Sequence, residues 1–499
     1  MDIFNHLALG FGVALTPLNL VYCLFGVLIG TLIGVLPGIG PIATIAMLLP
    51  ITFSLPSISA LIMLAGIYYG AMYGGSTTAI LVKLPGEAAS VVTCLDGYEM
   101  AKQGRAGPAL SIAALGSFFA GCVATLIIAL FAPFLAEIAL EFGPAEYFSM
   151  MVLGLVAAIV LAHGSLLKAI AMVILGIALG LIGTDVNTGT QRFTFGFSAL
   201  ADGISFVAVA MGMFGFSEII FNLEQREKRT IIVPQIQRLL PTRNDLKASW
   251  KPVLRGTALG SMLGILPGGG AVISAFSSYT LEKRLASDPS RFGKGAIEGV
   301  AGPESANNAG SQTSFIPLLT LGIPSNAVMA LMLGAMAIQG IAPGPNVMSE
   351  RPQLFWGIIA SMWIGNLFLV ILNLPLIGIW IRLLSVPYRY LFPAIILFCC
   401  IGVFSLSNSA FETALTAGFG LLGYIFVKLN CEPAPLLLGL ILGPMLEENL
   451  RRALRLSHGD AGVFFTNPIS LGMLITALLL LAVTILPIIR QKREKALHD

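Results

Sequence analysis

Residues 26–41 read GVLIGTLIGVLPGIGP, and residues 256–271 read GTALGSMLGILPGGGA. Each segment has the pattern of an apolar helix with a glycine at every fourth position, and each ends in the same Leu-Pro-Gly break. A duplicated helix that is broken inside an apolar chain is typical of secondary transporters, which bind substrate where the two copies meet. The seven identical positions are Gly26/Gly256, Gly30/Gly260, Gly34/Gly264, Leu36/Leu266, Pro37/Pro267, Gly38/Gly268 and Gly40/Gly270.

The composition indicates a membrane protein. Of the 499 residues, 56% are hydrophobic and only 11% are charged, whereas about 25% of a soluble domain is charged. Continuous apolar runs near the spanning length of roughly 20 residues recur along the chain, and a β-barrel would need short alternating segments instead. We therefore expect an all-α polytopic membrane protein. Residues 1–12 lack Lys, Arg and a small-residue cleavage pattern, so we expect no removable signal peptide.

The apolar segments form two corresponding sets. We expect a first repeat over residues 1–225, a connector over 226–251, a second repeat over 252–456, and an extra transmembrane helix with a basic tail over 457–499. Residues 224–255 carry eight basic and three acidic side chains, so the positive-inside rule predicts a cytoplasmic connector. The basic tail predicts a cytoplasmic C-terminus, and 82 opening residues without Lys or Arg predict a periplasmic N-terminus.

The loop charges predict that the two repeats are inverted in the membrane. Loop 137–146 carries three glutamates and is predicted outside, whereas its counterpart 382–389 carries two arginines and is predicted inside. Corresponding loops of opposite character indicate inverted-topology repeats. Arg451, Arg452 and Arg455 do not fit this scheme, because they would be periplasmic; either they meet a partner surface or the predicted side is wrong there.

Two stretches are too polar for a lipid-facing helix. Tyr69–Ser90 and Glu304–Val328 each run from small polar residues through a short apolar piece to a proline. A piece this short does not span a membrane alone, which favours a broken helix or a re-entrant hairpin. The hydroxyl and amide groups can replace water around an oxyanion or a small cation, although interhelical hydrogen bonding is the alternative role.

The breaks and the polar groups beside them form the candidate site, because half-helix N-termini attract anions and unwound carbonyls coordinate cations. The glycine rows before the breaks are expected to be packing faces. Lys83 would pair with a substrate carboxylate or with Glu87, or extend to the membrane interface. Glu87 and Glu304 are further ionisable groups near the breaks. The expected substrate contacts are Gly38, Gly40, Gly75, Ser76, Thr77, Thr78, Lys83, Pro85, Gly86, Gly268, Gly269, Asn307, Asn308, Ser311, Gln312, Thr313, Pro324, Ser325 and Asn326. The expected ion contacts are Gly38, Ser76, Gly268, Asn307 and Thr313.

The sequence lacks the motifs of enzyme chemistry. The six cysteines have no CxxC spacing, and neither HExxH nor GxxxxGK[ST] occurs. We expect no enzyme, no resident cofactor, no metal other than a transported sodium ion, and no nucleic-acid partner. An ion or solute channel is the main alternative, because broken helices also build selectivity filters. An intramembrane enzyme would need a positioned nucleophile and base, and no Ser/His pair supplies them.

Three long motifs resemble a known family. Residues 268–345, from GGGAVISAF to GIAPGP, look like the large membrane subunit of the tripartite tricarboxylate transporters, the TctA-like family. GVLPGIGPIATIAMLLP at residues 34–50 and the segment from YYGAMYGG to RAGPAL at residues 68–110 look like that family's other signature. The resemblance extends over essentially the whole chain.

The resemblance implies a multi-pass carrier in a bacterial inner membrane. It implies two partners, a small four-helix membrane subunit and a periplasmic solute-binding protein, while the oligomeric state is left open. The implied substrates are citrate-like di- or tricarboxylates or aromatic carboxylates, imported by symport with Na⁺ or H⁺. An elevator-type movement of a substrate-carrying domain would suit two broken hairpins in inverted halves.

Overall fold

The structure is a computed structural model. The structure describes residues 3–36, 40–162, 165–185, 188–224, 238–266, 270–383, 393, 396–397, 400–405 and 408–485. Five helices in these ranges are long and apolar enough to cross a membrane: α2 (Pro17–Val35), α4 (Ser57–Val82), α6 (Ala106–Ala139), α17 (Pro352–Asn373) and α20 (Ala410–Lys428). The chain is therefore a helical, multi-pass membrane protein, as its composition predicts.

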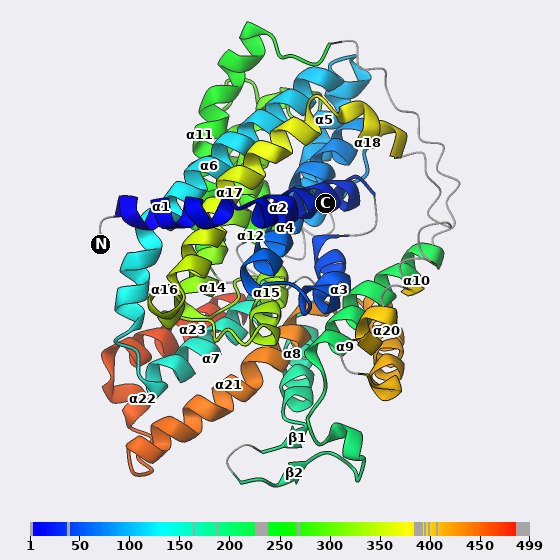
Figure 1. The fold of residues 1–499 in the computed structure, drawn as a ribbon. Coiled ribbons are helices and arrows are strands. Elements are labelled where there is room, and N and C mark those ends of the chain that lie inside the picture. The colour runs from blue at the N-terminus through cyan, green and yellow to red at the C-terminus, as the bar shows by residue number, and fades with distance from the viewer. Residues whose placement is uncertain are drawn as a thin grey trace. The chain divides into compact units, whose positions relative to one another are not determined.

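The described chain forms two compact units. The first contains residues 1–137 and 210–424, with α1 lying across α17 (Figure 1). Besides the long helices, its elements are α1 (Ile3–Ala14), α3 (Pro41–Thr52), η1 (Ala88–Val91), α5 (Thr93–Lys102), π-helical η3 (Met211–Phe216), α10 (Ser217–Glu224), α11 (Arg243–Ile265), α12 (Gly270–Leu285), η4 (Pro289–Arg291), α13 (Glu298–Thr313), α14 (Phe315–Leu321), α15 (Ala327–Ile338), α16 (Asn346–Glu350) and α18 (Ile377–Leu383).

The second unit contains residues 138–209 and 425–499. Its elements are α7 (Pro144–Leu161), α8 (Leu166–Gly180), β1 (Gly183–Thr184), β2 (Gln191–Arg192), η2 (Ser198–Leu200), α21 (Ala434–Leu456), α22 (Val463–Thr466) and α23 (Pro468–Ile485), while α9 (Phe206–Ala210) ends where this unit meets the first along the chain. The strands β1 and β2 pair antiparallel, with Gly183 opposite Arg192.

Two of the three arginines that did not fit the charge scheme have acidic partners within the second unit. Arg451 pairs with Asp185 at 3.0 Å and with Glu447 at 2.6 Å. Arg452 pairs with Glu448 of the same helix. These contacts account for the arginines as members of ion pairs, and the side of the membrane on which they lie stays a prediction.

The duplicated glycine rows are helix-contact faces in both copies. In the first, Gly26, Gly30 and Gly34 of α2 lie against backbone carbonyl groups of α4, and a Cβ atom at any of them would collide with that backbone. In the second, Gly256, Gly260 and Gly264 of α11 lie in the same way against α13. Small residues at this spacing let two helix backbones approach closely, so the two copies share one packing arrangement.

The contacts between the two copies are reciprocal. Helix α3 of the first copy packs against α15 of the second, and α12 of the second packs against η1 of the first. In the same way, α4 of the first copy contacts α15 of the second, and α13 of the second contacts α5 of the first. At the ends of these elements, Gln103 donates to the carbonyl oxygen of Lys294 at 2.8 Å, and Gln339 donates to the carbonyl oxygen of Thr52. Each copy thus offers the other the same kind of surface.

Three element boundaries differ from the sequence-based expectation. Residues 69–82 are not a separate short piece, because they continue the 26-residue helix α4, which is long enough to span by itself. Helix α11 begins at Arg243, where Thr242 caps it, so it takes in the end of the expected connector. Helix α12 continues to Leu285, although the charged stretch Tyr279–Glu298 has the composition of a solvated loop. The connector residues 225–237 and most of loop 382–389 lie outside the described residues.

Candidate functional site

A buried carboxylate lies where α4, α5 and α13 meet. Glu304 is 1% exposed. Its two carboxylate oxygens accept hydrogen bonds from the hydroxyl groups of Ser76 on α4 and Thr93 on α5. The structure therefore joins the two polar stretches of the sequence, Tyr69–Ser90 and Glu304–Val328, at one acid.

A second buried carboxylate lies beside the first. Glu87 is 8% exposed and caps η1, where the backbone N–H of Ala89 donates to its Oε2 at 2.7 Å. The amide nitrogen of Asn307 donates to its Oε1 at 3.3 Å. Because Asn307 lies on α13 one turn after Glu304, the face of α13 that carries Glu304 also contacts Glu87.

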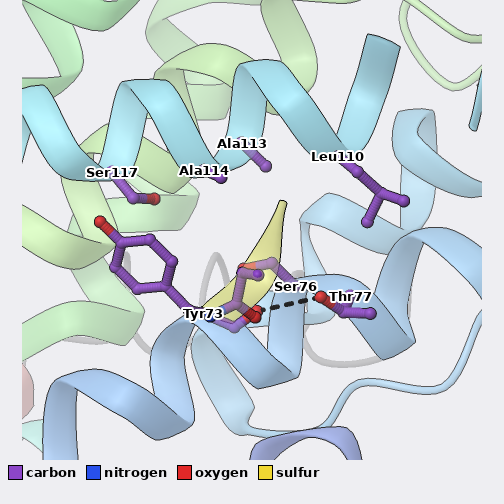
Figure 2. A pocket seen from close by; sticks show the side chains of 8 residues that line it. Tyr73, Ser76, Thr77, Leu110, Ala113, Ala114 and Ser117 are labelled. Carbon is purple, nitrogen blue, oxygen red and sulfur yellow. Dashed lines mark hydrogen bonds between the residues drawn. The ribbon is translucent and has the colours of Figure 1, made fainter. Parts of the chain in front are cut away.

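Figure 2 shows a small cavity whose lining includes Ser76, the residue that bonds to Glu304. Tyr73, Ser76 and Thr77 of α4 form one wall, and Ser117 of α6 points in from the opposite wall. Thr77 donates to the carbonyl oxygen of Tyr73, whereas the buried hydroxyl of Tyr73 has no partner. The space is about 10 Å³ for the centre of a water molecule, which is roughly the room that one water needs.

Several side-chain amide atoms of α13 are buried without a hydrogen-bond partner. Asn307 and Asn308 each use their nitrogen as a donor, Asn308 toward Ser117 at 2.7 Å, but their side-chain oxygens accept nothing. Both polar atoms of Gln312 are equally unpaired. Buried polar groups are nearly always satisfied in proteins, so unpaired ones suggest a ligand, an ion or water.

The other hydroxyl groups that the sequence singled out bond to backbone carbonyls. Thr78 donates to the carbonyl oxygen of Val35 at 3.0 Å, and so stabilises the broken end of α2. Ser311 and Thr313 donate to Asn307 and Ala309 one turn earlier in α13. These three residues serve helix structure in this conformation, and their contact with substrate is untested.

Glycines let the loop after α4 pack closely against α2 and α4. A Cβ on Gly86 would collide with backbone atoms of Gly34 and Gly75, and a Cβ on Gly75 would meet Glu87. Pro85 in the same loop is exposed. Lys83 is also exposed, lies 5.8 Å from the centre of the Tyr98 ring, and makes no ion pair with Glu87 among the described contacts.

The corresponding loop of the second copy follows the same design. Lys83 ends α4 in the left-handed conformation, and Gly322 ends α14 in the same way. A proline follows two residues later in each copy, Pro85 and Pro324. A capping residue comes next: Glu87 caps η1, and Asn326 caps α15 by accepting from Met329 at 3.0 Å. Ser325 donates to the carbonyl oxygen of Ser314 at 3.3 Å.

The Leu-Pro-Gly breaks themselves lie outside the described residues. Three predicted contact residues, Gly38, Gly268 and Gly269, fall within residues 37–39 and 267–269, which the structure does not describe. The flanks agree with the prediction, since α2 ends at Val35 before α3, and α11 ends at Ile265 before α12. At the first break, the N–H of Gly40 donates to the carboxylate of Glu218 at 3.2 Å.

Comparison with known proteins identifies the family. The family model described as "Tripartite tricarboxylate transporter TctA family" matches residues 20–438. The chain belongs to the TctA family. It is therefore a membrane subunit of a tripartite tricarboxylate transporter, which works with other subunits, and it is not an enzyme. No solved structure matches the chain.

Two relatives come from Agrobacterium vitis. One, the "Uncharacterized 52.8 kDa protein in TAR-I ttuC' 3'region", is 59% identical over 495 residues, which is 99% of each chain. The other, the "Uncharacterized protein in TAR-II ttuC' 3'region", is 60% identical over 236 residues, which is 47% of this chain and 98% of the relative. The first relative matches the whole chain, and the second matches about half of it.

Some residues of this TctA site were not singled out from the sequence. The local sequence does not mark Tyr73, Thr93 or Ser117 as site residues, because each is a common residue inside a helix. Only the side chains that face them from other helices place them at the site. Glu218 had a usable signal, since an acid inside the apolar run 203–222 is a functional-site indication by default.

Proposed function

We propose that this TctA subunit imports a di- or tricarboxylate across a bacterial inner membrane in symport with a cation, Na⁺ or H⁺. The observation that carries the proposal is the buried polar cluster around Glu304, to which both sequence repeats contribute groups beside interrupted helices. An ionisable group inside a membrane protein is expensive to bury and usually belongs to a substrate or ion pathway.

The mechanism we propose is alternating access between two inverted repeats, with an elevator-type movement of the part that holds the substrate. The reciprocal contacts of the two copies and the opposite charge of their loops support this arrangement. Backbone N–H groups near Gly38, Gly86, Gly268 and Ser325 would bind the substrate carboxylates, because half-helix N-termini favour anions. The substrate would lie close to the cation, so that each strengthens binding of the other.

We further propose the partners and the orientation. A periplasmic solute-binding protein delivers a citrate-like or aromatic carboxylate, and a small four-helix membrane subunit completes the complex. The N-terminus is periplasmic and the C-terminus is cytoplasmic. Membership in a tripartite transporter family supports the existence of other subunits, and the distribution of Lys and Arg supports the orientation.

The test is uptake by proteoliposomes that contain this chain and the small subunit. Citrate, succinate and benzoate are first screened for binding to the solute-binding protein, and the radiolabelled ligand is then offered with that protein. We expect saturable accumulation that needs both the binding protein and a sodium or proton gradient, and none in vesicles with the small subunit alone. Non-saturating flux that ignores the gradient would instead establish a channel.

A further inference from the structure

Glu87 and Glu304 are two buried acids for which the described structure provides no cationic partner. Neither carboxylate takes part in any ion pair found among the described residues. The lysine on the same loop, Lys83, is exposed and faces Tyr98. Two negative charges held together away from water cost several kcal/mol each unless positive charge neutralises them, so this pair calls for a cation.

The atoms around the two acids are oxygens that suit a hard cation. Both carboxylates accept hydrogen bonds only, and the unpaired side-chain oxygens of Asn307 and Asn308 lie on the same helix face as Glu304. Asn307 and Asn308 are fully buried. Carboxylate and amide oxygens are what alkali and alkaline-earth ions prefer in proteins.

The cavity lined by Ser76, whose hydroxyl bonds to Glu304, is small. Its hydroxyl lining includes Ser76, which bonds to Glu304, and Tyr73, which is 3% exposed and whose own hydroxyl has no partner. The room is about that of one water molecule. A dehydrated sodium ion or a water molecule fits such a space, and a citrate-sized anion does not.

We propose that Glu87 and Glu304, with the side-chain oxygens of Asn307 and Asn308, form the coupling site and bind one monovalent cation, a sodium ion or a proton. The inference rests on the proposed symport. Its chemistry is the addition of one positive charge to a buried pair of acids that carries one proton already, because two neighbouring carboxylates do not both ionise; the loaded pair is then neutral. Tyr68 and Tyr73 of α4 and Cys94 of α5 are the other titratable groups near the pair, and tyrosine and cysteine side chains ordinarily titrate above physiological pH.

Binding is tested first on the purified full chain in detergent, without substrate or partners. Sodium replaces potassium at constant ionic strength, and the melting temperature Tm is recorded at several pH values. A sodium site predicts a saturable rise of Tm with sodium; a proton site predicts no sodium effect and a Tm that varies with pH. Either response must be lost in Glu304→Gln and Glu87→Gln and kept in Glu99→Gln, an acid on α5 outside the cluster.

Transport by the reconstituted complex gives the second readout. Glu304→Gln keeps the shape of the carboxyl group without its charge, so we expect it to lose gradient-driven accumulation. Should Glu304→Gln fold poorly, Glu87→Gln and the charge-preserving Glu304→Asp replace it. Loss of accumulation while the sodium or pH response of Tm stays as in the wild type would indicate a structural role and overturn the assignment.

The two proposals fail in different ways. If the wild type shows neither a sodium-dependent nor a pH-dependent Tm, or if both Gln variants respond as the wild type does, the coupling site is wrong. If the Gln variants still accumulate substrate when a cation gradient is supplied, the assignment of the coupling site is wrong and the symport proposal stands. If cation binding is present and lost in the variants, but the wild-type complex shows only uncoupled flux, the symport proposal falls and the cation site remains.

Discussion

At the scale of single residues, Asp96 is the most heavily bonded acid of the described chain. Its Oδ1 accepts from the backbone N–H groups of Gly293, Gly295 and Ala296 at 2.8–2.9 Å, and Tyr279 donates to its Oδ2 at 3.0 Å. Asp96 is fully buried at the start of α5. One side chain of the first copy therefore fixes the loop before α13 of the second copy.

Removal of this carboxylate should loosen that loop. Asp96→Ala leaves three backbone donors without an acceptor, and we expect it to lower stability by at least about 3 kcal/mol. Asp96→Asn, which keeps an acceptor oxygen, should cost less. The measurement is Tm in detergent, with protease cleavage between residues 286 and 297 as a local readout. Asp288→Ala is the control, because the exposed Asp288 bonds only to nearby Ser290; an equal loss in both variants would contradict the idea.

At the scale of elements, the two glycine rows make matching predictions. Gly30→Ala and Gly260→Ala each place a methyl group on the backbone of the facing helix, at Ile67 and at Ala306. We expect each to lower stability by about 1–3 kcal/mol through overpacking. Gly12→Ala in α1 is the control, since a Cβ there meets nothing within 4 Å, and it should raise helix stability slightly. Tm of the three variants checks this, and a harmless Gly260→Ala would refute the shared packing.

The elements also show what the sequence could predict. Helices α2 and α3 appear nearly where apolar runs and the Pro-Gly break place them, because length and hydrophobicity alone decide a membrane helix. The expected short piece within Tyr69–Ser90 was wrong over residues 69–82, which continue α4, since small polar residues remain helical when neighbouring helices cover them. The candidate site was predicted in part: Ser76 and Asn307 lie at the acids, but Thr93 and Ser117 could be assigned only from packing between distant segments.

At the scale of the whole first unit, the contacts between loops bear on which loops share a side of the membrane. Asp96 and Gln103 bind the loop that contains Lys294. On the other copy, Gln339 binds the turn after α3, where Ser57 donates to its side-chain oxygen at 2.9 Å. Each loop pair must lie on one side, and the basic residues predict that the first pair is cytoplasmic.

Inverted repeats require the second pair to be periplasmic, which single-cysteine labelling can test. The six native cysteines are first replaced, and Ser54→Cys and Lys294→Cys are then introduced separately at exposed positions. In intact cells we expect a membrane-impermeant maleimide to label the first variant and to label the second only after permeabilisation. Lys102→Cys is the control and should follow Lys294→Cys, because Gln103 ties the end of α5 to that loop. Labelling of Ser54→Cys and Lys294→Cys from one side would mean parallel copies, and the half-helix ends of the two copies would then point the same way across the membrane, leaving no common midplane site between them.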